Sequence, residues 1–211
     1  MLAFDLETYQ DDQVLPWLPP CEAPGNYKDP DKIAAAIAEK TRERNSKLAL
    51  DPDCCRIVAL GYATTGSGGV PTVNICQDEA DETIALENFW AEWERVGAAP
   101  VGFNCVGFDL PVLVQRSRLL SVSYPRINLR RYGSPDCYDL MLILNHDGIT
   151  SAKSLGFWCK RFRLDVPEDT TSGKDIAGMV EAQDWAAVER HCAIDVAKTW
   201  ALARRVLPGV E

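Results

Sequence analysis

A pair of acidic residues near the start of the sequence could do hydrolytic chemistry. Asp5 and Glu7 follow an apolar run that begins at Met1, and the whole stretch predicts a short strand. Side chains two residues apart on a strand project to the same face, so the two carboxylates would lie side by side. Neighbouring carboxylates repel each other unless a cation lies between them. The pair predicts a cation site better than a solvent-facing strand edge, because the preceding run is apolar.

Two further acidic residues stand at helical positions. Asp109 comes just before a predicted helix that begins with Leu110 and Pro111, where it could equally serve as an N-cap. Asp195 lies four residues after His191 in a strongly helical segment, and this spacing stacks both side chains on one face. Histidine has an unperturbed pKa of about 6.5, so it could act as a general base beside a metal ligand or form a simple surface pair. Taken singly, none of these places decides the function.

Together and in this order, the acidic residues strongly resemble the DEDD superfamily of 3′–5′ exonucleases, which has a ribonuclease H-like fold. The resemblance is strongest to stand-alone relatives of the proofreading domain in family-B DNA polymerases, and it covers most of the chain. The three motifs of that family are matched by Asp5 and Glu7, by Asn104, Phe108 and Asp109, and by Asp195. Val196 and Thr199 complete the third motif.

The general base departs from the family pattern. Members of the superfamily use as general base either a tyrosine separated from the last acid by three residues, or a histidine separated from it by four. Here His191 stands at the tyrosine spacing, and the longer register would need an acid where Val196 stands. We therefore expect Asp195 to be the fourth acid and His191 to be the base.

The resemblance implies a cofactor and a set of substrate contacts. Two divalent cations, Mg²⁺ or Mn²⁺, would be held by Asp5, Glu7, Asp109 and Asp195, and His191 would accept the proton of the attacking water. The residues implied to lie against the 3′-terminal nucleotide are Leu6, Thr8, Phe103, Asn104 and Phe108. Leu6 and Phe103 could equally be core residues.

The charge of the chain is divided unevenly. The formal net charge is −9, yet the segment 110–135 holds five arginines and no acid, and the segment 148–164 holds four basic residues and no acid. We expect the first segment, with Arg116, Arg118, Arg126, Arg130 and Arg131, to follow the phosphates of the substrate. Trp158 and Phe162 in the second could stack on bases or pack in the core. The alternative is that both segments form solvated helix faces.

Hydrophobic periodicity and turn signals predict an α/β domain with a mixed sheet flanked by helices. Strands are expected over residues 1–8, 55–65, 70–76 and 100–104. Helices are expected over 31–47, 82–96, 110–120, 138–145, 151–161, 173–182 and 184–206. The 211 residues suit a single domain, in which the segment of about 10–50 forms a helical insertion.

Other classes of protein fit the sequence less well. The eight cysteines include no C-x₂-C pair, so we expect neither a zinc site nor a disulfide. No apolar stretch is long enough to span a bilayer, and we expect a cytoplasmic protein that acts on single-stranded DNA ends, with a polymerase or a repair partner in trans. An exoribonuclease with the same site and a catalytically silent nucleic-acid-binding module remain alternatives.

Overall fold

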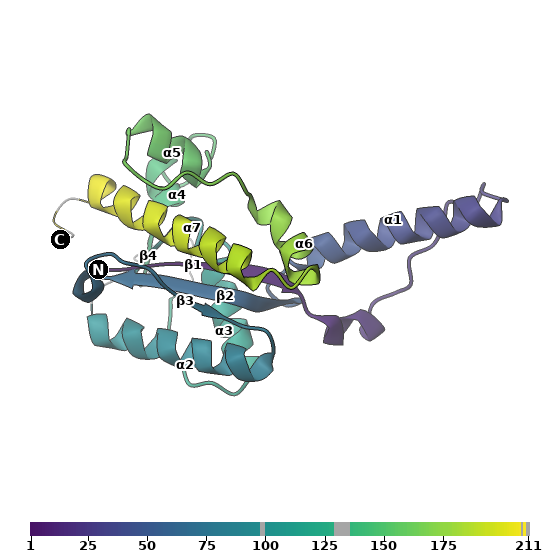
Figure 1. Cartoon of the computed structure of the whole chain (residues 1–211), viewed down its shortest axis with the longest axis horizontal. Helices are drawn as coiled ribbons and strands as arrows, with labels where there is room; N and C mark the ends of the chain where they lie inside the picture. Colours follow the sequence, from purple (N-terminus) through teal and green to yellow (C-terminus); the bar gives the residue numbers. More distant parts are fainter. Residues whose placement is uncertain (98–99, 129–135, 208, 210–211) are drawn as a thin grey trace.

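A computed structural model describes residues 1–97, 100–128, 136–207 and 209. One five-stranded sheet lies at its centre, with helices on both faces (Figure 1). The strand order is β3-β2-β1-β4-β5. The strands are β1 (Leu2–Gln10), β2 (Cys55–Thr64), β3 (Thr72–Ile75), β4 (Val101–Gly102) and β5 (Tyr138–Asp139).

The sheet is mixed, as the sequence predicts. Strand β1 pairs antiparallel with β2 and parallel with β4, β2 pairs antiparallel with β3, and β4 pairs parallel with β5. Strand β4 is shorter than the predicted 100–104. Strand β5 was not predicted, because its two residues merge in sequence with the helix that follows them.

Seven α-helices are present among the described residues, close to the predicted positions. They are α1 (Pro30–Leu48), α2 (Glu79–Val96), α3 (Asp109–Leu119), α4 (Leu140–Leu144), α5 (Leu155–Arg161), α6 (Ile176–Glu181) and α7 (Trp185–Val206). Aspartates cap several of them; Asp29 and Asp78 accept hydrogen bonds from amides of the first turns of α1 and α2. Within the described part of the chain, no helix is both long and apolar enough to cross a membrane.

Strand β1 divides its side chains between the two faces of the sheet. Leu2, Phe4 and Leu6 point into the core beneath α2, where the rings of Phe4 and Phe89 lie 5.3 Å apart. Helices α2 and α3 cover this face, and α7 crosses the opposite face (Figure 1). The alternation of β1 therefore turns Asp5 and Glu7 toward α7.

The pairing of β1 with β2 is irregular beside the acidic pair. Glu7 lies opposite Ala59 and Thr8 lies opposite Ile57, so Val58 is an extra residue on β2. Val58 and Ala59 consequently both pack on the α7 side of the sheet. Bulges of this kind bend a strand locally and occur often beside active sites.

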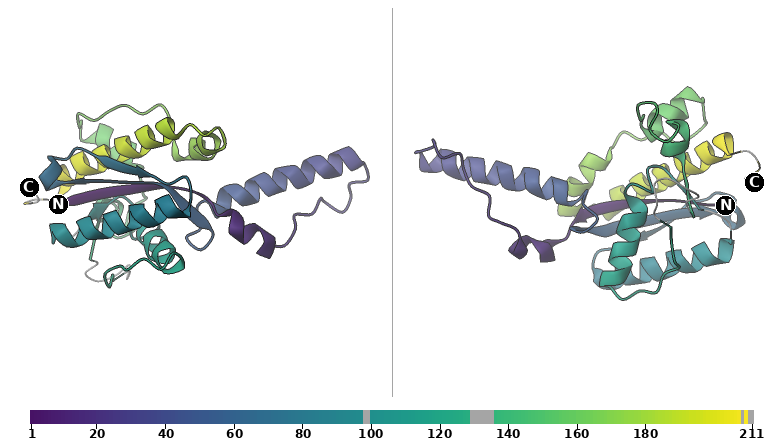
Figure 2. Two further views of the ribbon diagram at one scale, coloured as in Figure 1. Left: turned by 60° about the horizontal axis from the view of Figure 1, so that its bottom comes forward. Right: turned by 180° about the vertical axis from the view of Figure 1, so that it is seen from behind.

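The predicted insertion forms an arm, which we define as residues 12–48. It consists of a 3₁₀ turn (Asp12–Trp17), an irregular segment and α1, and α1 projects away from the sheet in every view (Figures 1 and 2). Lys40 Nζ donates to the carbonyl of Glu22 (2.8 Å), which ties the irregular segment to α1. The Thr8 hydroxyl donates to the carbonyl of Ala49 (2.6 Å) and anchors the base of the arm to β1.

Close packing of α7 on the sheet depends on Gly61 of β2. A Cβ at this position would lie 2.7 Å from Cys192 Sγ and 2.8 Å from Val196 Cγ2. We expect Gly61→Ala to lower the free energy of unfolding by about 1–3 kcal/mol, because α7 must move outward. Chemical denaturation measures the change. Gly178→Ala in α6, where a Cβ has open space, is the control and should not lower stability; equal stability of the two variants would contradict this packing.

Candidate active site

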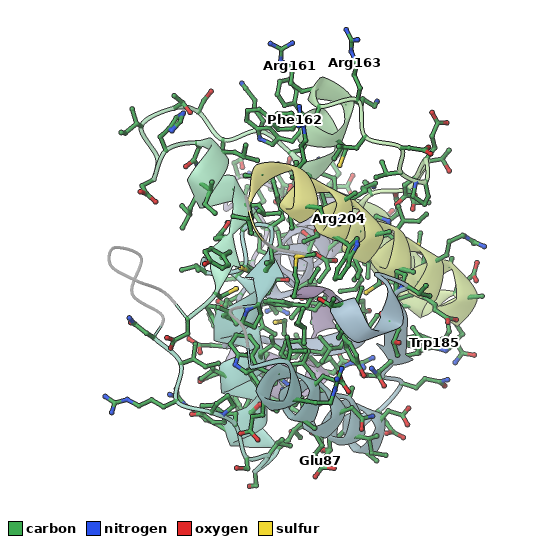
Figure 3. The ribbon with its side chains drawn as sticks, turned by 90° about the vertical axis from the view of Figure 1, so that its left-hand side faces the viewer. Glu87, Arg161, Phe162, Arg163, Trp185 and Arg204 are labelled. Atoms are coloured by element: carbon green, nitrogen blue, oxygen red, sulfur yellow. The ribbon has the colours of Figure 1, made fainter. Side chains whose placement is uncertain are left out.

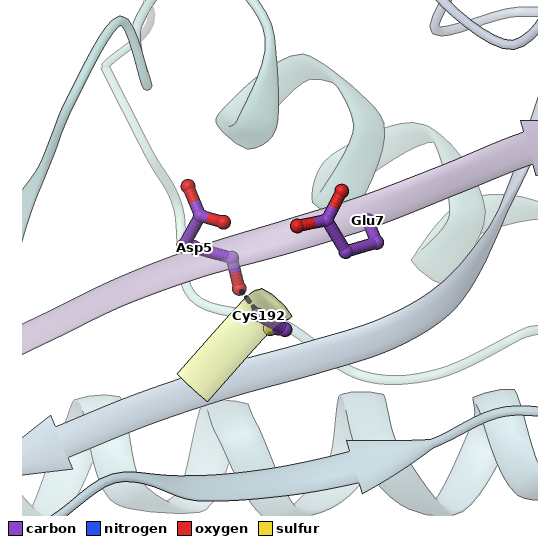
Figure 4. A group of neighbouring side chains, drawn as sticks. All are labelled: Asp5, Glu7 and Cys192. Atoms are coloured by element: carbon purple, nitrogen blue, oxygen red, sulfur yellow. Dashed lines mark hydrogen bonds between the residues drawn. The ribbon is translucent and has the colours of Figure 1, made fainter. Parts of the chain in front are cut away.

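Asp5 and Glu7 of β1 form the centre of the candidate site. Their carboxylates and Cys192 Sγ of α7 lie within 4.8 Å of one another (Figure 4). The thiol donates a weak hydrogen bond to the carbonyl of Asp5 (3.8 Å). The acidic pair thus lies in the layer between the sheet and α7, as the alternation of β1 predicts.

Asp109 reaches the same place from the start of α3. Phe108 is the N-cap of this helix and no side chain caps it, so the N-cap reading of Asp109 is wrong. The Asp109 carboxylate is instead hydrogen-bonded by its own amide and by the amide of Leu6, both of which lower its pKa. Asp109 is therefore tied directly to the residue between Asp5 and Glu7.

Asp195 approaches from α7, one turn after His191. Lys198 Nζ lies 2.7 Å from Asp195 Oδ1, and both side chains are largely buried. The charge of Asp195 raises the pKa of both Asp5 and Glu7, whereas Lys198 lowers that of Asp5. The four predicted acids therefore come from three elements and act electrostatically on one another.

Burial and mutual repulsion make the acidic cluster costly to ionise. The pKa of Asp5 is raised well above its ordinary value by burial first, and then by Glu7, Asp109 and Asp195. Burial first, and then Asp195, Asp109 and Asp169, raise the pKa of Glu7 well above its ordinary value. Burial raises the pKa of Asp109 to about 7. A bound cation would remove this penalty, because it stabilises the ionised carboxylates.

The chemistry of the donors fits a hard divalent cation. Burial, followed by the nearby acids, raises the pKa of the Cys192 thiol well above its ordinary value, which disfavours the thiolate that a metal would bind. The remaining donors are carboxylate oxygens, which Mg²⁺ and Mn²⁺ prefer.

His191 is buried and oriented by a residue that the sequence did not point to. Its Nδ1 lies 2.5 Å from Asp169 Oδ2, and the Thr171 hydroxyl, 3.0 Å from Nδ1, donates to the same carboxylate. Burial raises the pKa of Asp169, but hydrogen bonds from Thr171 and His191 outweigh burial and lower it overall. A carboxylate is an acceptor only, so Nδ1 carries the proton. Nε2 then faces the acids, 3.6 Å from Glu7 Oε1.

The residues expected at the 3′-terminal nucleotide differ in their burial and in their hydrogen bonds. Leu6 is buried in the core under α2, and the Thr8 hydroxyl is engaged by Ala49. Phe103 and Phe108 are half-buried against core residues. Asn104 has a positive φ of 63°, and its amide donates to Asp139 Oδ1 (2.9 Å). Its side chain is left partly exposed at the turn before α3.

The expectation that Arg116 contacts substrate phosphates is wrong. Its side chain is 2% exposed and lies on the α2 side of the sheet. The guanidinium donates to both carboxylate oxygens of Glu82 (2.7 and 2.8 Å) and to Asp11 (2.8 Å). An arginine so enclosed stabilises the fold and has no free donor face for a phosphate.

The other basic residues are surface residues where they are described. Arg118 donates to the Tyr124 hydroxyl (2.8 Å), while Arg130 and Arg131 lie outside the described residues. In the second segment, Arg161 and Arg163 point outward beyond α5 (Figure 3). The rings of Trp158 and Phe162 stack on each other, 5.7 Å apart, in a core cluster. This packing favours the core reading of both aromatic residues.

Three polar residues of the site could not be identified from the family motifs. Asp139 accepts hydrogen bonds from the amides of Asn104 and Val106 and so fixes the turn before Asp109. Its position before an apolar helical run could have marked it as an N-cap, which it also is. Asp169 contacts the site from a loop, and Lys198 contacts it from α7. Neither is one of the residues that define the family motifs.

A comparison with known protein families identifies the family to which this chain belongs. Residues 50–207 match a family described as a predicted 3′–5′ exonuclease related to the exonuclease domain of PolB. The chain belongs to this family. Asp109, His191 and Asp195 lie inside the matched segment, whereas Asp5, Glu7 and the arm precede it. Strand β1 adds the first acidic motif, which the fold brings beside the matched residues.

One curated protein and one solved structure are similar to this chain. The chain is 31% identical over 164 residues to the uncharacterized protein MJ0365 of Methanocaldococcus jannaschii, covering 72% of this chain and 86% of that protein. The structure of the present chain is similar to that of the family B DNA polymerase from Pyrobaculum calidifontis, with a TM-score of 0.63 and 20% identity. The similarity covers 98% of this chain but 24% of the polymerase, and it shows a common ribonuclease H-like fold.

The raised pKa of Asp109 predicts how stability depends on pH without metal. The native state holds this proton more tightly than the unfolded chain, so stability falls as the pH rises from about 4, an ordinary aspartate value, to about 7. Without metal and near pH 8, we expect Asp109→Asn to raise the melting temperature by about 2–4 °C, the effect of 1 kcal/mol in a domain of this size.

Mn²⁺ should stabilise the wild type more near pH 8 than near pH 5, because the cation competes with protons for the carboxylates. Thermal denaturation with chelator or Mn²⁺ measures both effects. Asp165→Asn, at an exposed acid, is the control. A chelated wild type whose stability rises between these pH values would contradict the electrostatic account.

Proposed function

We propose that this protein is a metal-dependent 3′–5′ exonuclease that removes 5′-mononucleotides from the 3′ end of single-stranded DNA. The observation that carries the proposal is that Asp5 and Glu7 lie together on β1, within electrostatic reach of Asp109 and Asp195 and beside a buried, oriented histidine. Membership of an exonuclease family related to PolB supports the reaction class.

Asp5, Glu7, Asp109 and Asp195 would hold two divalent cations. When bound, such cations lower the pKa of the attacking water and stabilise the leaving 3′ oxygen. Lys198 contributes a fixed positive charge at the edge of this cluster through its pair with Asp195. It therefore offsets part of the negative charge that the acids and a phosphate would bring together.

His191 would act as the general base. Asp169 holds the proton on Nδ1, so the lone pair of Nε2 is directed toward the acids and can accept a proton from water. The resulting hydroxide attacks phosphorus, and the bond to the 3′ oxygen breaks. The developing imidazolium is stabilised by the Asp169 carboxylate, in the same way that carboxylates support histidine bases in other hydrolases.

The 3′-terminal nucleotide would lie beside the turn at Asn104 and the end of β1. The half-buried rings of Phe103 and Phe108 border this region and would contact its sugar and base. Arg116 takes no part, because it is enclosed by Glu82 and Asp11.

The direct test is cleavage of 3′- and 5′-labelled single-stranded DNA and RNA with Mg²⁺, Mn²⁺ or chelator. We expect stepwise loss from the 3′ end of DNA in the presence of metal. Asp5→Asn should lower the rate by at least about 10³-fold, because it removes a ligand of the proposed cations. Calorimetry should show weakened Mn²⁺ binding by the same variant. Undiminished cleavage by Asp5→Asn, or faster cleavage of RNA than of DNA, would overturn the corresponding part of the proposal.

The roles of His191 and Asp169 make a second prediction. His191→Ala should lower kcat by about 10²-fold, the usual loss for a general base. Asp169→Asn should lower it by about 10-fold, as loss of an orienting partner does, and should change the tautomer of His191 in ¹⁵N NMR spectra. Asp165→Asn in the same segment is the matched control. Wild-type kcat in Asp169→Asn, with an unchanged tautomer, would remove Asp169 from the mechanism.

A further inference from the structure

A groove lies between α1 and α6, at the end of β1, and the proposed reaction does not use it. Its volume is about 430 Å³. Polar side chains that line it include Tyr9, Gln10, Arg42, Asn45, Ser46 and Glu181. Figures 1 and 2 show α1 leaving the body of the protein beside α6, so the arm supplies one wall of the groove and the body supplies the other.

The groove begins on β1 two residues beyond the acidic pair. Tyr9 follows Glu7 by two residues on the same strand and packs against the core cluster that also contains Cys192 and Val196. The hydrogen bond from Thr8 to Ala49 holds the end of α1 at this point. A ligand in the groove would therefore lie next to a chain end held at the acids.

Helix α1 of the arm is basic in a protein that is acidic, although the arm as a whole is neutral. Helix α1 carries five basic and three acidic residues, a charge of +2, whereas the whole chain carries −9 and the remainder therefore −11. Its arginine at the groove, Arg42, pairs with Glu39 at 2.7 Å, but these side chains are 76% and 59% exposed. Such an exposed pair is weak and leaves the guanidinium free to meet another anion.

The side chains of the groove suit a polynucleotide more than a small anion. Arg42, Asn45 and Ser46 lie along one side of α1, where the Arg42 guanidinium and the Asn45 amide offer donors, while the Ser46 hydroxyl donates to the Glu43 carbonyl (2.9 Å). The half-buried Tyr9 presents an aromatic ring, with Arg56 5.8 Å from its centroid. Glu181 is the one acid among the described residues lining the groove, and the Tyr9 hydroxyl donates to it (3.4 Å). Donors along a backbone and an aromatic ring for bases are the features of single-strand binding sites.

We propose that this groove binds the nucleotides upstream of the 3′ terminus, so that the arm holds a single-stranded polynucleotide while its end lies at the acids. This inference rests on the proposed exonuclease function, and it assigns the arm, which precedes the segment matched by the family, to substrate binding. It predicts that affinity grows with strand length through contacts to the arm.

The test measures binding apart from hydrolysis. Fluorescence anisotropy follows 5′-labelled oligothymidylates of about 3 and about 12 nucleotides, a range that spans known single-strand site sizes, in Ca²⁺ to prevent cleavage. The groove variant is Arg42→Glu combined with Ser46→Glu. The control is Arg95→Glu on α2, which changes an arginine that also pairs with a glutamate three residues before it at the surface, here Glu92 (2.6 Å).

We expect the groove variant to bind the longer strand at least about 10-fold more weakly and with a smaller salt slope, while the control binds within about 2-fold of wild type. The gain in affinity from the shorter to the longer strand should also disappear in the groove variant alone. Equal losses in the groove variant and the control, or no loss in either, would overturn the inference. Wild-type cleavage of the same strands in Mg²⁺ reports separately on the proposed function, so the two can fail independently.

Discussion

Holding buried and half-buried carboxylates together on one side of β1 is the constraint on which the rest of this structure depends. Asp5 and Glu7 share a face of β1, Asp109 is hydrogen-bonded to the amide between them, and Asp195 completes the cluster from α7. Burial and repulsion raise the pKa of the first three, so the fold must supply compensating energy elsewhere. The apolar face of the same strand, packed beneath α2, supplies part of it. A divalent cation supplies the remainder in the state that we propose to be active.

The same strand therefore builds the core and the site, and the two cannot be altered independently. Gly61 allows α7 to approach the sheet closely enough for Cys192 and Val196 to pack on it, and this approach sets where His191 and Asp195 lie. The extra residue Val58 on β2 lies beside Glu7 and increases the local bend of the strand pair. Asp139 and Asp169 act on this frame as supports, one for the turn before Asp109 and one for the imidazole of His191.

The sequence predicted those parts of the protein that depend on local periodicity. The two-residue spacing of Asp5 and Glu7 and the four-residue spacing of His191 and Asp195 place side chains on one face whatever the surroundings, and the mixed sheet followed from the order of strands and helices. Asp169 meets His191 across a loop without periodicity, so no spacing could reveal it. Arg116 was misread for the same reason. Its partners Glu82 and Asp11 lie 34 and 105 residues away, and an arginine in a basic segment looks exposed until they are known.

The acids of the site come from β1, α3 and α7, and the distance between these elements in the sequence determines when the site forms during folding. Asp5 and Asp195 are separated by almost the whole chain, so the site is made of contacts of very high sequence separation. Such contacts form late, because the entropy of closing a long loop must be overcome first. A chain that is still being synthesised lacks α7 and with it a complete acid cluster. In the exonuclease that we propose, incomplete and partly folded molecules therefore lack the catalytic site, which is completed only by the final closure of the fold.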